Sequence, residues 1–300
     1  MPLNIVSHPD YDANFPADHR FPMGKYRALA RRLEATGLLA RSAHVLPDFA
    51  PEAALKRAHD PVYVDQVLAC QVPEKIEREI GFPVSELVSR RARRSAGGTL
   101  LAARLALHHG IACNAAGGSH HARHAHGAGF CTLNDVAVAA LNLLAERPQA
   151  RILVVDLDVH QGDGTADILR DEPRAFTFSM HAERNYPVRK LASDLDIALP
   201  DGTGDDQYLR HLAGALARLS GTAQWDIVFY NAGVDPHADD RLGRLALSDD
   251  GLRERDRMTI GHFRAMGVPV CGVIGGGYSR DIDALAARHS ILFEVASEFA

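Results

Sequence analysis

Four polar residues that suit metal binding, Asp156, Asp158, His160 and Asp163, follow closely after the apolar run 152–155. In an extended chain alternate side chains point to the same side, so Asp156, Asp158 and His160 can converge on one point. Carboxylates are rarely fully buried unless they are paired or bound to a metal. An alternative is a polar loop in which Asp163 caps the following helix, but capping requires only one of these residues. The pattern therefore favours a metal site.

Three further apolar runs, 111–114, 225–230 and 268–274, also lead into polar loops rich in glycine. Glycine lets the backbone approach a ligand or a neighbouring loop closely. Near these strand ends the chain places His120, His121, Asp235 and Tyr278. A turn aspartate or a solvated histidine would be the simpler interpretation of each residue alone. Their repeated occurrence after apolar runs favours a shared site.

The apolar runs alternate with helical patterns, such as 84–109 and 134–146. This alternation predicts an α/β fold with an open parallel sheet flanked by helices. In such sheets the binding crevice lies at the carboxyl ends of the strands, where all the polar loops would meet. Hydrophobic residues make up 46% of the chain, which is ample for a large core. Without an internal repeat or a long linker, we expect one domain over residues 1–300.

Three other polar or charged groups of residues are interpreted as surface. Segment 73–83 is charged and irregular, and it is expected to be a loop bordering a site entrance. His124 and His126 are expected to be solvated. The same applies to the basic cluster on the long predicted helix, which comprises Arg90, Arg91, Arg93 and Arg94.

Composition narrows the possible partners. The formal net charge of −5 gives no global basic field that would attract nucleic acid. The chain has no apolar run long enough for a membrane span and no signal-peptide pattern at its start, so a cytoplasmic protein with no membrane partner is expected. Its four cysteines form no C-x-x-C pair, which gives no indication of a thiolate zinc site.

Six motifs stand in the strand-end loops and the segments beside them. They are Gly-Gly-Ser-His-His at 117–121, Gly-Phe-Cys at 129–131, Asp-Leu-Asp-Val-His-Gln-Gly-Asp-Gly at 156–164, Asn-Ala-Gly-Val-Asp at 231–235, Asp-Arg-Leu-Gly at 240–243 and Gly-Gly-Gly-Tyr at 275–278. Taken together, these motifs resemble the zinc-dependent histone deacetylase family of the arginase/deacetylase superfamily. Gln161 stands where many members carry a second histidine, and in this the chain is most similar to class IV members and their bacterial relatives.

The resemblance implies an arginase-like fold and a set of metal sites. A catalytic zinc would be held by Asp158, His160 and Asp235, leaving a position open for water and substrate. Two carboxylates and one imidazole would also accept Fe²⁺ or Co²⁺. The family further implies a monovalent cation, K⁺, close to Asp156, Asp158, His160 and Ser179.

The resemblance also implies catalytic roles. His121 would be the general base and later the acid, His120 would assist electrostatically, and Tyr278 would donate a hydrogen bond to the oxyanion. Asp156 and Asp163 would orient the two histidines. An apolar channel for the lysine stem and the acyl chain would be lined by Phe130, Tyr186 and Leu242.

The implied activity is amide hydrolysis by metal-activated water, removing acetyl or longer acyl groups from lysine side chains of proteins or peptides. An acetylpolyamine or other small-molecule amidohydrolase is an alternative within the same fold. An acidic, narrow entrance would favour polyamines and a wide one would favour proteins. A catalytically silent metal-binding interaction module is the alternative of another class. Acyl chain length and oligomeric state stay open at this level.

Overall fold

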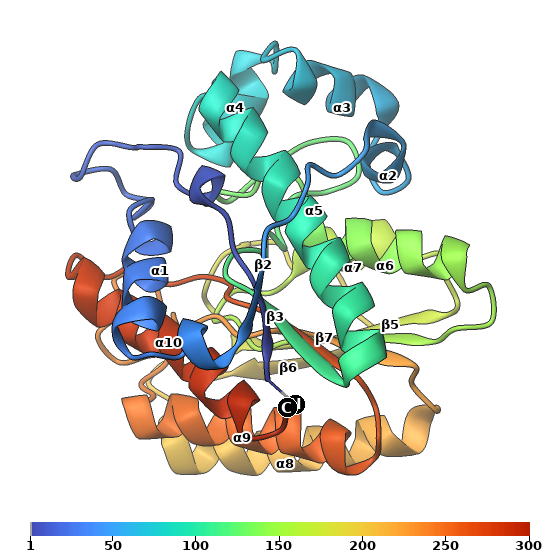
Figure 1. Cartoon of the computed structure of the whole chain (residues 1–300), viewed down its shortest axis with the longest axis vertical. Coiled ribbons are helices and arrows are strands. Elements are labelled where there is room, and N and C mark those ends of the chain that lie inside the picture. The colour runs from blue at the N-terminus through green and yellow to red at the C-terminus, as the bar shows by residue number, and fades with distance from the viewer. Residues whose placement is uncertain (1) are drawn as a thin grey trace.

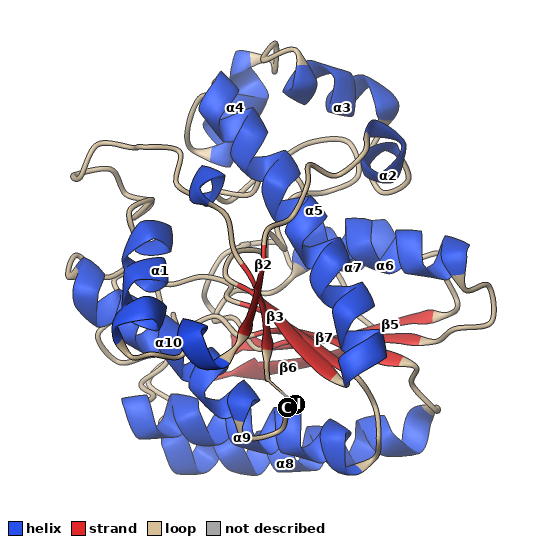
Figure 2. Ribbon diagram, viewed as in Figure 1, coloured by secondary structure: helices blue, strands red, loops and turns tan. Residues whose placement is uncertain are grey.

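The computed structural model describes residues 2–300, whose strands form one parallel sheet with the order β2-β1-β3-β8-β7-β4-β5-β6. The predicted open parallel sheet flanked by helices is therefore confirmed (Figure 2). The strands are β1 (Asn4–Val6), β2 (Ala43–Val45), β3 (Ile111–Asn114), β4 (Ile152–Asp156), β5 (Ala175–Ala182), β6 (Leu195–Leu199), β7 (Ile227–Asn231) and β8 (Val270–Val273).

Helices cover both faces of this sheet. They are α1 (Lys25–Ala35), α2 (Glu52–Lys56), α3 (Pro61–Leu68), α4 (Glu74–Ile80), α5 (Glu86–His109), α6 (Asp135–Glu146), α7 (Asp163–Leu169), α8 (Asp205–Thr222), α9 (Asp249–Ala265) and α10 (Ile282–Ser297). Two short 3-10 segments, η1 (Pro9–Tyr11) and η2 (Leu39–Arg41), lie near the start of the chain. Within residues 2–300 no helix is both long and apolar enough to cross a membrane.

The strand sequences explain the layers. In β4, Ile152 and Val154 pack into the core beneath α5 and α6, whereas Leu153 and Val155 belong to the larger core on the opposite face. A strand with apolar side chains on both faces must be covered on both sides. Figure 1 shows α5, α6 and α7 over one face, and α8 and α9 with α10 over the other.

β4 is an interior strand of the sheet and pairs with β5 on one side and β7 on the other. Because all the strands run in the same direction, their carboxyl ends meet at one edge. The loops that follow β3, β4, β5, β7 and β8 therefore lie together there. This arrangement brings segments more than a hundred residues apart in the chain into one site.

Segment 73–83 was expected to be an irregular loop, and this expectation is wrong: it contains α4. The helix starts after Pro73, carries acidic residues in its first turn and ends at Gly81, which has φ +98°. Proline before the first turn and a left-handed glycine after the last one are ordinary helix boundaries. Ile80 is the buried residue of this helix, and the many charged residues before it obscured the helical periodicity in the sequence.

The expectation of a solvated basic face on α5 is also wrong at Arg91, which is only 4% exposed. Its Nε donates to the carbonyl of Tyr11 at 3.1 Å, and its Nη2 donates to the hydroxyl of Tyr26. A buried guanidinium needs such acceptors. The acceptors come from η1 and α1, distant segments that the local charge pattern does not reveal.

Candidate active site

Asp158, His160 and Asp235 form a buried cluster at the carboxyl ends of β4 and β7. Each offers one potential ligand atom, and these three atoms lie within 4.8 Å of one another. The Nδ1 atom of His160 is 3.0 Å from Asp158 Oδ1 and 3.1 Å from Asp235 Oδ2. All three residues are at most 6% exposed. This geometry can hold a metal ion.

The electrostatics of the cluster fit a cation. Burial, followed by the neighbouring charge of Asp158, raises the pKa of Asp235 to about 7. Burial opposes protonation of His160, but hydrogen bonds to Asp158 and Asp235 outweigh it and raise the pKa of His160 to about 10. Two buried carboxylates this close together require compensating positive charge. Two carboxylates and one imidazole are a suitable donor set for a divalent transition metal.

Backbone groups fix the orientation of both carboxylates. The amide of Gly276 donates to Asp158 Oδ2 at 2.7 Å, and the amide of Val159 donates to Asp235 Oδ1 at 2.9 Å. A Cβ atom on Gly276 would lie 2.1 Å from Asp235 Oδ2 and 2.7 Å from Asp158 Oδ2. Glycine is therefore required at position 276 for the backbone to approach both carboxylates.

We expect Gly276→Ala to weaken binding of a divalent metal by roughly 10- to 100-fold, the usual range when groups that orient metal ligands are disturbed. The added methyl group must displace at least one of the two carboxylates. Zinc titration by calorimetry or with a competing chelator measures the change. Gly214→Ala is the matched control, since a Cβ at this position of α8 meets nothing within 4 Å. Equal zinc affinity of Gly276→Ala and the native protein would contradict this role for the glycine.

Two adjacent histidines from the loop after β3 border the cluster. His120 Nδ1 lies 2.7 Å from Asp156 Oδ2, and His121 Nδ1 lies 2.7 Å from Asp163 Oδ1. The two imidazole rings have centroids 4.1 Å apart. Because each Nδ1 faces a carboxylate, each Nε2 is left on the other side of its ring.

The surroundings push the pKa values of these two histidines apart. Burial lowers the pKa of His121 to about 4, and the charge of His120 acts in the same direction. Burial also disfavours protonation of His120, but the charges of Asp156 and Asp158 outweigh it and raise its pKa to about 9. One neutral and one charged imidazole side by side can divide acid and base roles.

The sequence analysis did not identify two residues that hydrogen-bond to the carboxylates of Asp156 and Asp163. Asn231 Nδ2 donates to Asp156 Oδ1 at 3.0 Å, and Arg123 Nη2 donates to Asp163 Oδ2 at 2.6 Å. Asn231 starts the Asn-Ala-Gly-Val-Asp motif, which was a usable signal. Arg123 stands in the histidine-rich loop, where nothing in the local pattern distinguishes it from solvated residues.

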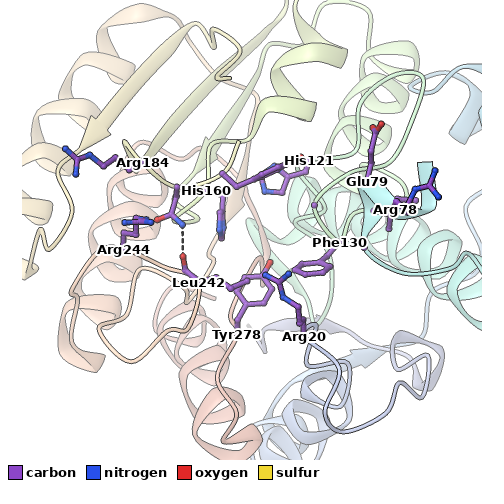
Figure 3. A pocket seen from close by; sticks show the side chains of 15 residues that line it. Arg20, Arg78, Glu79, His121, Phe130, His160, Arg184, Leu242, Arg244 and Tyr278 are labelled. Atoms are coloured by element: carbon purple, nitrogen blue, oxygen red, sulfur yellow. Dashed lines mark hydrogen bonds between the residues drawn. The ribbon is translucent and has the colours of Figure 1, made fainter. Parts of the chain in front are cut away.

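A pocket of about 400 Å³ opens in front of His121 and His160. Figure 3 shows Tyr278 across the pocket from His121, with Phe130 beside it. Tyr186 and Leu242 also line the cavity, and the Tyr186 ring packs edge-on against His121 with centroids 4.7 Å apart. The mouth thus leads through apolar side chains to the polar cluster.

The end of α4 holds one wall of this pocket in place. The amide of Gly129 donates to the carbonyl of Glu79 at 3.0 Å, and the amide of Phe130 donates to the carbonyl of Ile80 at 2.7 Å. Phe130 has φ +67°, a strained backbone conformation for a bulky residue. These two hydrogen bonds explain how the strained residue stays against the pocket.

Ser179 lies outside the pocket, where it is the register partner of Asp156 across β4 and β5. Its Oγ is 2.9 Å from His181 Nδ1. The structure therefore places Ser179 behind the polar cluster, next to the strand end that carries Asp156. His124 is exposed, and His126 is half-buried with its Nε2 3.6 Å from Glu79, so neither histidine joins the cluster.

Comparisons with known proteins agree with this architecture. A family model described as the histone deacetylase domain matches residues 19–293. An uncharacterized protein of Picosynechococcus is 47% identical over 99% of both chains. Histone deacetylase 2 of Arabidopsis thaliana is 31% identical over 93% of this chain and 75% of its own length.

Two solved structures share the fold. A crystal structure of an HDAC homolog in complex with SAHA has a TM-score of 0.85 at 24% identity, covering 99% of this chain and 84% of that one. The HDA15 HD domain has a TM-score of 0.83 at 22% identity, covering 99% and 89%. With the family model matched over most of its length, the chain belongs to the histone deacetylase family and is a hydrolase that acts on amide bonds.

Proposed function

We propose that this protein is a zinc-dependent lysine deacylase, which hydrolyses the amide bond between an acetyl or longer acyl group and a lysine side chain of a protein. The observation that carries the proposal is a single pocket that is lined by His121, His160 and Tyr278 and has Asp158 and Asp235 directly behind it. A metal-binding or interaction module needs no pair of carboxylate-oriented histidines, so the arrangement favours catalysis over a silent module.

Asp158, His160 and Asp235 would hold the zinc ion. When bound, a divalent metal polarises the scissile carbonyl and makes a water molecule a better nucleophile. Fe²⁺ or Co²⁺ would suit the same donors. We further propose that K⁺ binds behind the site, near Asp156, Asp158, His160 and Ser179. The adjacent strand positions of Asp156 and Ser179 support this location.

The histidines would move the protons. His121 is neutral at pH 7 because its pKa is lowered to about 4, and its Nδ1 is held by Asp163, so its Nε2 can accept a proton from the attacking water. His121 would then give this proton to the leaving lysine amine. His120, oriented by Asp156, carries positive charge and makes the protonated form of His121 a stronger acid.

The remaining pocket residues would bind the substrate. Tyr278 would donate its hydroxyl proton to the carbonyl oxygen and to the oxyanion that develops from it. Phe130, Tyr186 and Leu242 would enclose the lysine stem and the acyl chain, since apolar walls exclude water from a methylene chain. Each of these groups acts on a different part of the acyl-lysine.

The test is release of free lysine from peptides that carry acetyl-, butyryl-, octanoyl- or myristoyl-lysine. The protein is first freed of metal with a chelator and then reconstituted with Zn²⁺, Fe²⁺ or Co²⁺. We expect cleavage only after a metal is restored, with the panel giving the acyl preference. Failure of every metal-loaded form to cleave any peptide would refute the lysine deacylase proposal. Metal-independent cleavage would refute the metal assignment.

A further inference from the structure

The mouth of the pocket is lined by arginines from four separate segments of the chain. Figure 3 shows them on different sides of the opening, with Glu79 as the one carboxylate among the lining residues. The arginines are Arg20 before α1, Arg78 on α4, Arg184 after β5 and Arg244 in the loop after β7. All four are exposed. This group is called the arginine rim below.

Internal ion pairs leave part of this positive charge unmatched. Arg78 pairs with Glu74 at 2.6 Å, and Arg244 pairs with Asp201 at 3.2 Å. Among residues 2–300, neither Arg20 nor Arg184 has a carboxylate within 4.0 Å. The rim therefore keeps two free guanidinium groups at the entrance.

Glu79, the carboxylate among the pocket-lining residues, does not cancel this positive charge. Glu79 lies 3.6 Å from His126 Nε2 and points away from the centre of the pocket (Figure 3). The nearby Glu77 is turned elsewhere, because its Oε1 accepts a hydrogen bond from the amide of Val84 at 2.7 Å. The chain as a whole has a formal net charge of −5, so the mouth is positively charged although the protein is negatively charged overall.

This charge distribution acts on a substrate before chemistry begins. Charges of one sign around a cleft raise the local concentration of oppositely charged ligands and their association rates. Residues flanking an acyl-lysine in a bound peptide lie at the mouth, within one Debye length of the rim at physiological salt. An aspartate or glutamate there gains an attractive partner, whereas a lysine or arginine is repelled. Guanidinium groups also form two-pronged hydrogen bonds with carboxylates.

We infer that this enzyme selects acyl-lysines that stand in acidic protein segments. The inference rests on the proposed deacylase function and adds the class of substrate. Acetylated polyamines and strongly basic tails carry the opposite charge, and the rim disfavours both. Arg20 and Arg184 are the specificity-determining residues, since they have no internal partner and can turn to the substrate.

The test uses three acetyl-lysine peptides that are identical except for the residues on either side of the acetyl-lysine, which are Asp, Ser or Lys. We expect kcat/KM of the zinc-loaded enzyme to be on the order of 10-fold higher for the acidic than for the basic peptide at low salt. The ratio should shrink as salt is raised, because exposed charges are screened. The double variant Arg20→Glu, Arg184→Glu should reverse this order of preference.

Arg218→Glu is the control for charge reversal away from the pocket, because it replaces one exposed arginine of α8 with glutamate. That residue lies near the end of α8, which leads back to the amino edge of β7, opposite the pocket. The control should keep the preference for the acidic peptide. A preference unchanged in the double variant would overturn the role of the two arginines.

Equal rates for the three peptides, or faster cleavage of the basic peptide or of an acetylated polyamine, would overturn the inference. Binding of the same fluorescent peptides to metal-free protein, measured by anisotropy, separates this failure from failure of the proposed function. Tighter binding of the acidic peptide without any cleavage would support the rim and refute the deacylase. Equal affinity for the three peptides would refute the proposed role of the arginine rim, whether or not the protein cleaves them.

Discussion

Replacing Tyr278 with phenylalanine is expected to lower kcat for acyl-lysine hydrolysis by ~10²- to 10³-fold, the usual cost of losing one oxyanion donor. The hydroxyl is suited to donate, because burial and the charges of Asp235 and Asp158 raise its pKa well above the ordinary value for tyrosine. Tyr278 therefore stays protonated at any working pH. A donor aimed at charge that develops only in the transition state affects kcat more than substrate binding.

The ring should keep its place without the hydroxyl. The Tyr278 amide donates to Asp240 Oδ2 at 2.7 Å, and the ring packs at 5.8 Å from Phe130 and 6.4 Å from Phe21. Steady-state kinetics on an acetyl-lysine peptide measures the change, with zinc affinity checked for both proteins. Tyr208→Phe removes a buried hydroxyl on α8 outside the pocket and should leave kcat unchanged. A Tyr278→Phe enzyme with native kcat would remove the tyrosine from the proposed mechanism.

The central strands and their parallel arrangement were predictable from the sequence. β4 consists of consecutive apolar residues bounded by polar turns, and such runs form strands that are buried on both faces. Helix α5 was equally clear, because a long helical pattern runs to His109 and is followed by Gly110. Once the runs were read as parallel strands, their polar loops had to share one edge. The fold class followed from this, the family was predicted from the resemblance of the motifs, and both are confirmed.

Short or charged elements were less predictable. α4 spans only seven residues, and five of them are charged. A pattern this short gives little periodicity, so the flanking prolines suggested a loop. Its helical form matters to the pocket, because its last carbonyls bind the amides of Gly129 and Phe130. Tertiary contacts such as these stabilise short helices but leave no trace in the local pattern.

The environment of each charged side chain was the least predictable feature. Arg91 and Arg94 both belong to the basic cluster of α5, yet Arg91 is buried against Tyr26 and Arg94 pairs with Asp10 at 3.2 Å. The arginine rim is assembled from segments between positions 20 and 244, so no spacing rule connects its members. The motifs predicted candidate catalytic residues, whereas the surface proposed to meet the substrate depends on how distant segments fold together.

Replacing His121 with alanine is expected to lower kcat by ~10²- to 10⁴-fold, the contribution usually made by a general acid–base group. No neighbour can replace it as a base. His120 is the nearest imidazole, but Asp156 and Asp158 raise its pKa to about 9, so it already carries a proton at pH 7. His124→Ala is the matched control, because that histidine is exposed in the same loop. It should retain native kcat.

The protonation states behind this prediction can be measured directly. Proton NMR of the metal-free protein should show His59, His121 and His181 titrating near pH 4, with one of these signals lost in His121→Ala. The signal of His120 should titrate near pH 9. The depressed pKa means that the unfolded chain binds a proton at His121 more readily than the folded one. His121 therefore contributes stability that is fully present above pH 6.5 and is lost as the pH falls toward 4.

The raised pKa of His120 acts with the opposite sign. Its contribution to stability is fully present below pH 6.5 and is lost as the pH rises through about 9. Two histidines that titrate together near pH 6.5 would contradict the division of roles, even if His121→Ala were inactive. In that case the loss of activity would reflect a damaged pocket. If His120 and His121 titrate separately and His121→Ala keeps native zinc affinity, the loss of activity is assigned to the missing base, because the charge on His120 and the metal site are then intact.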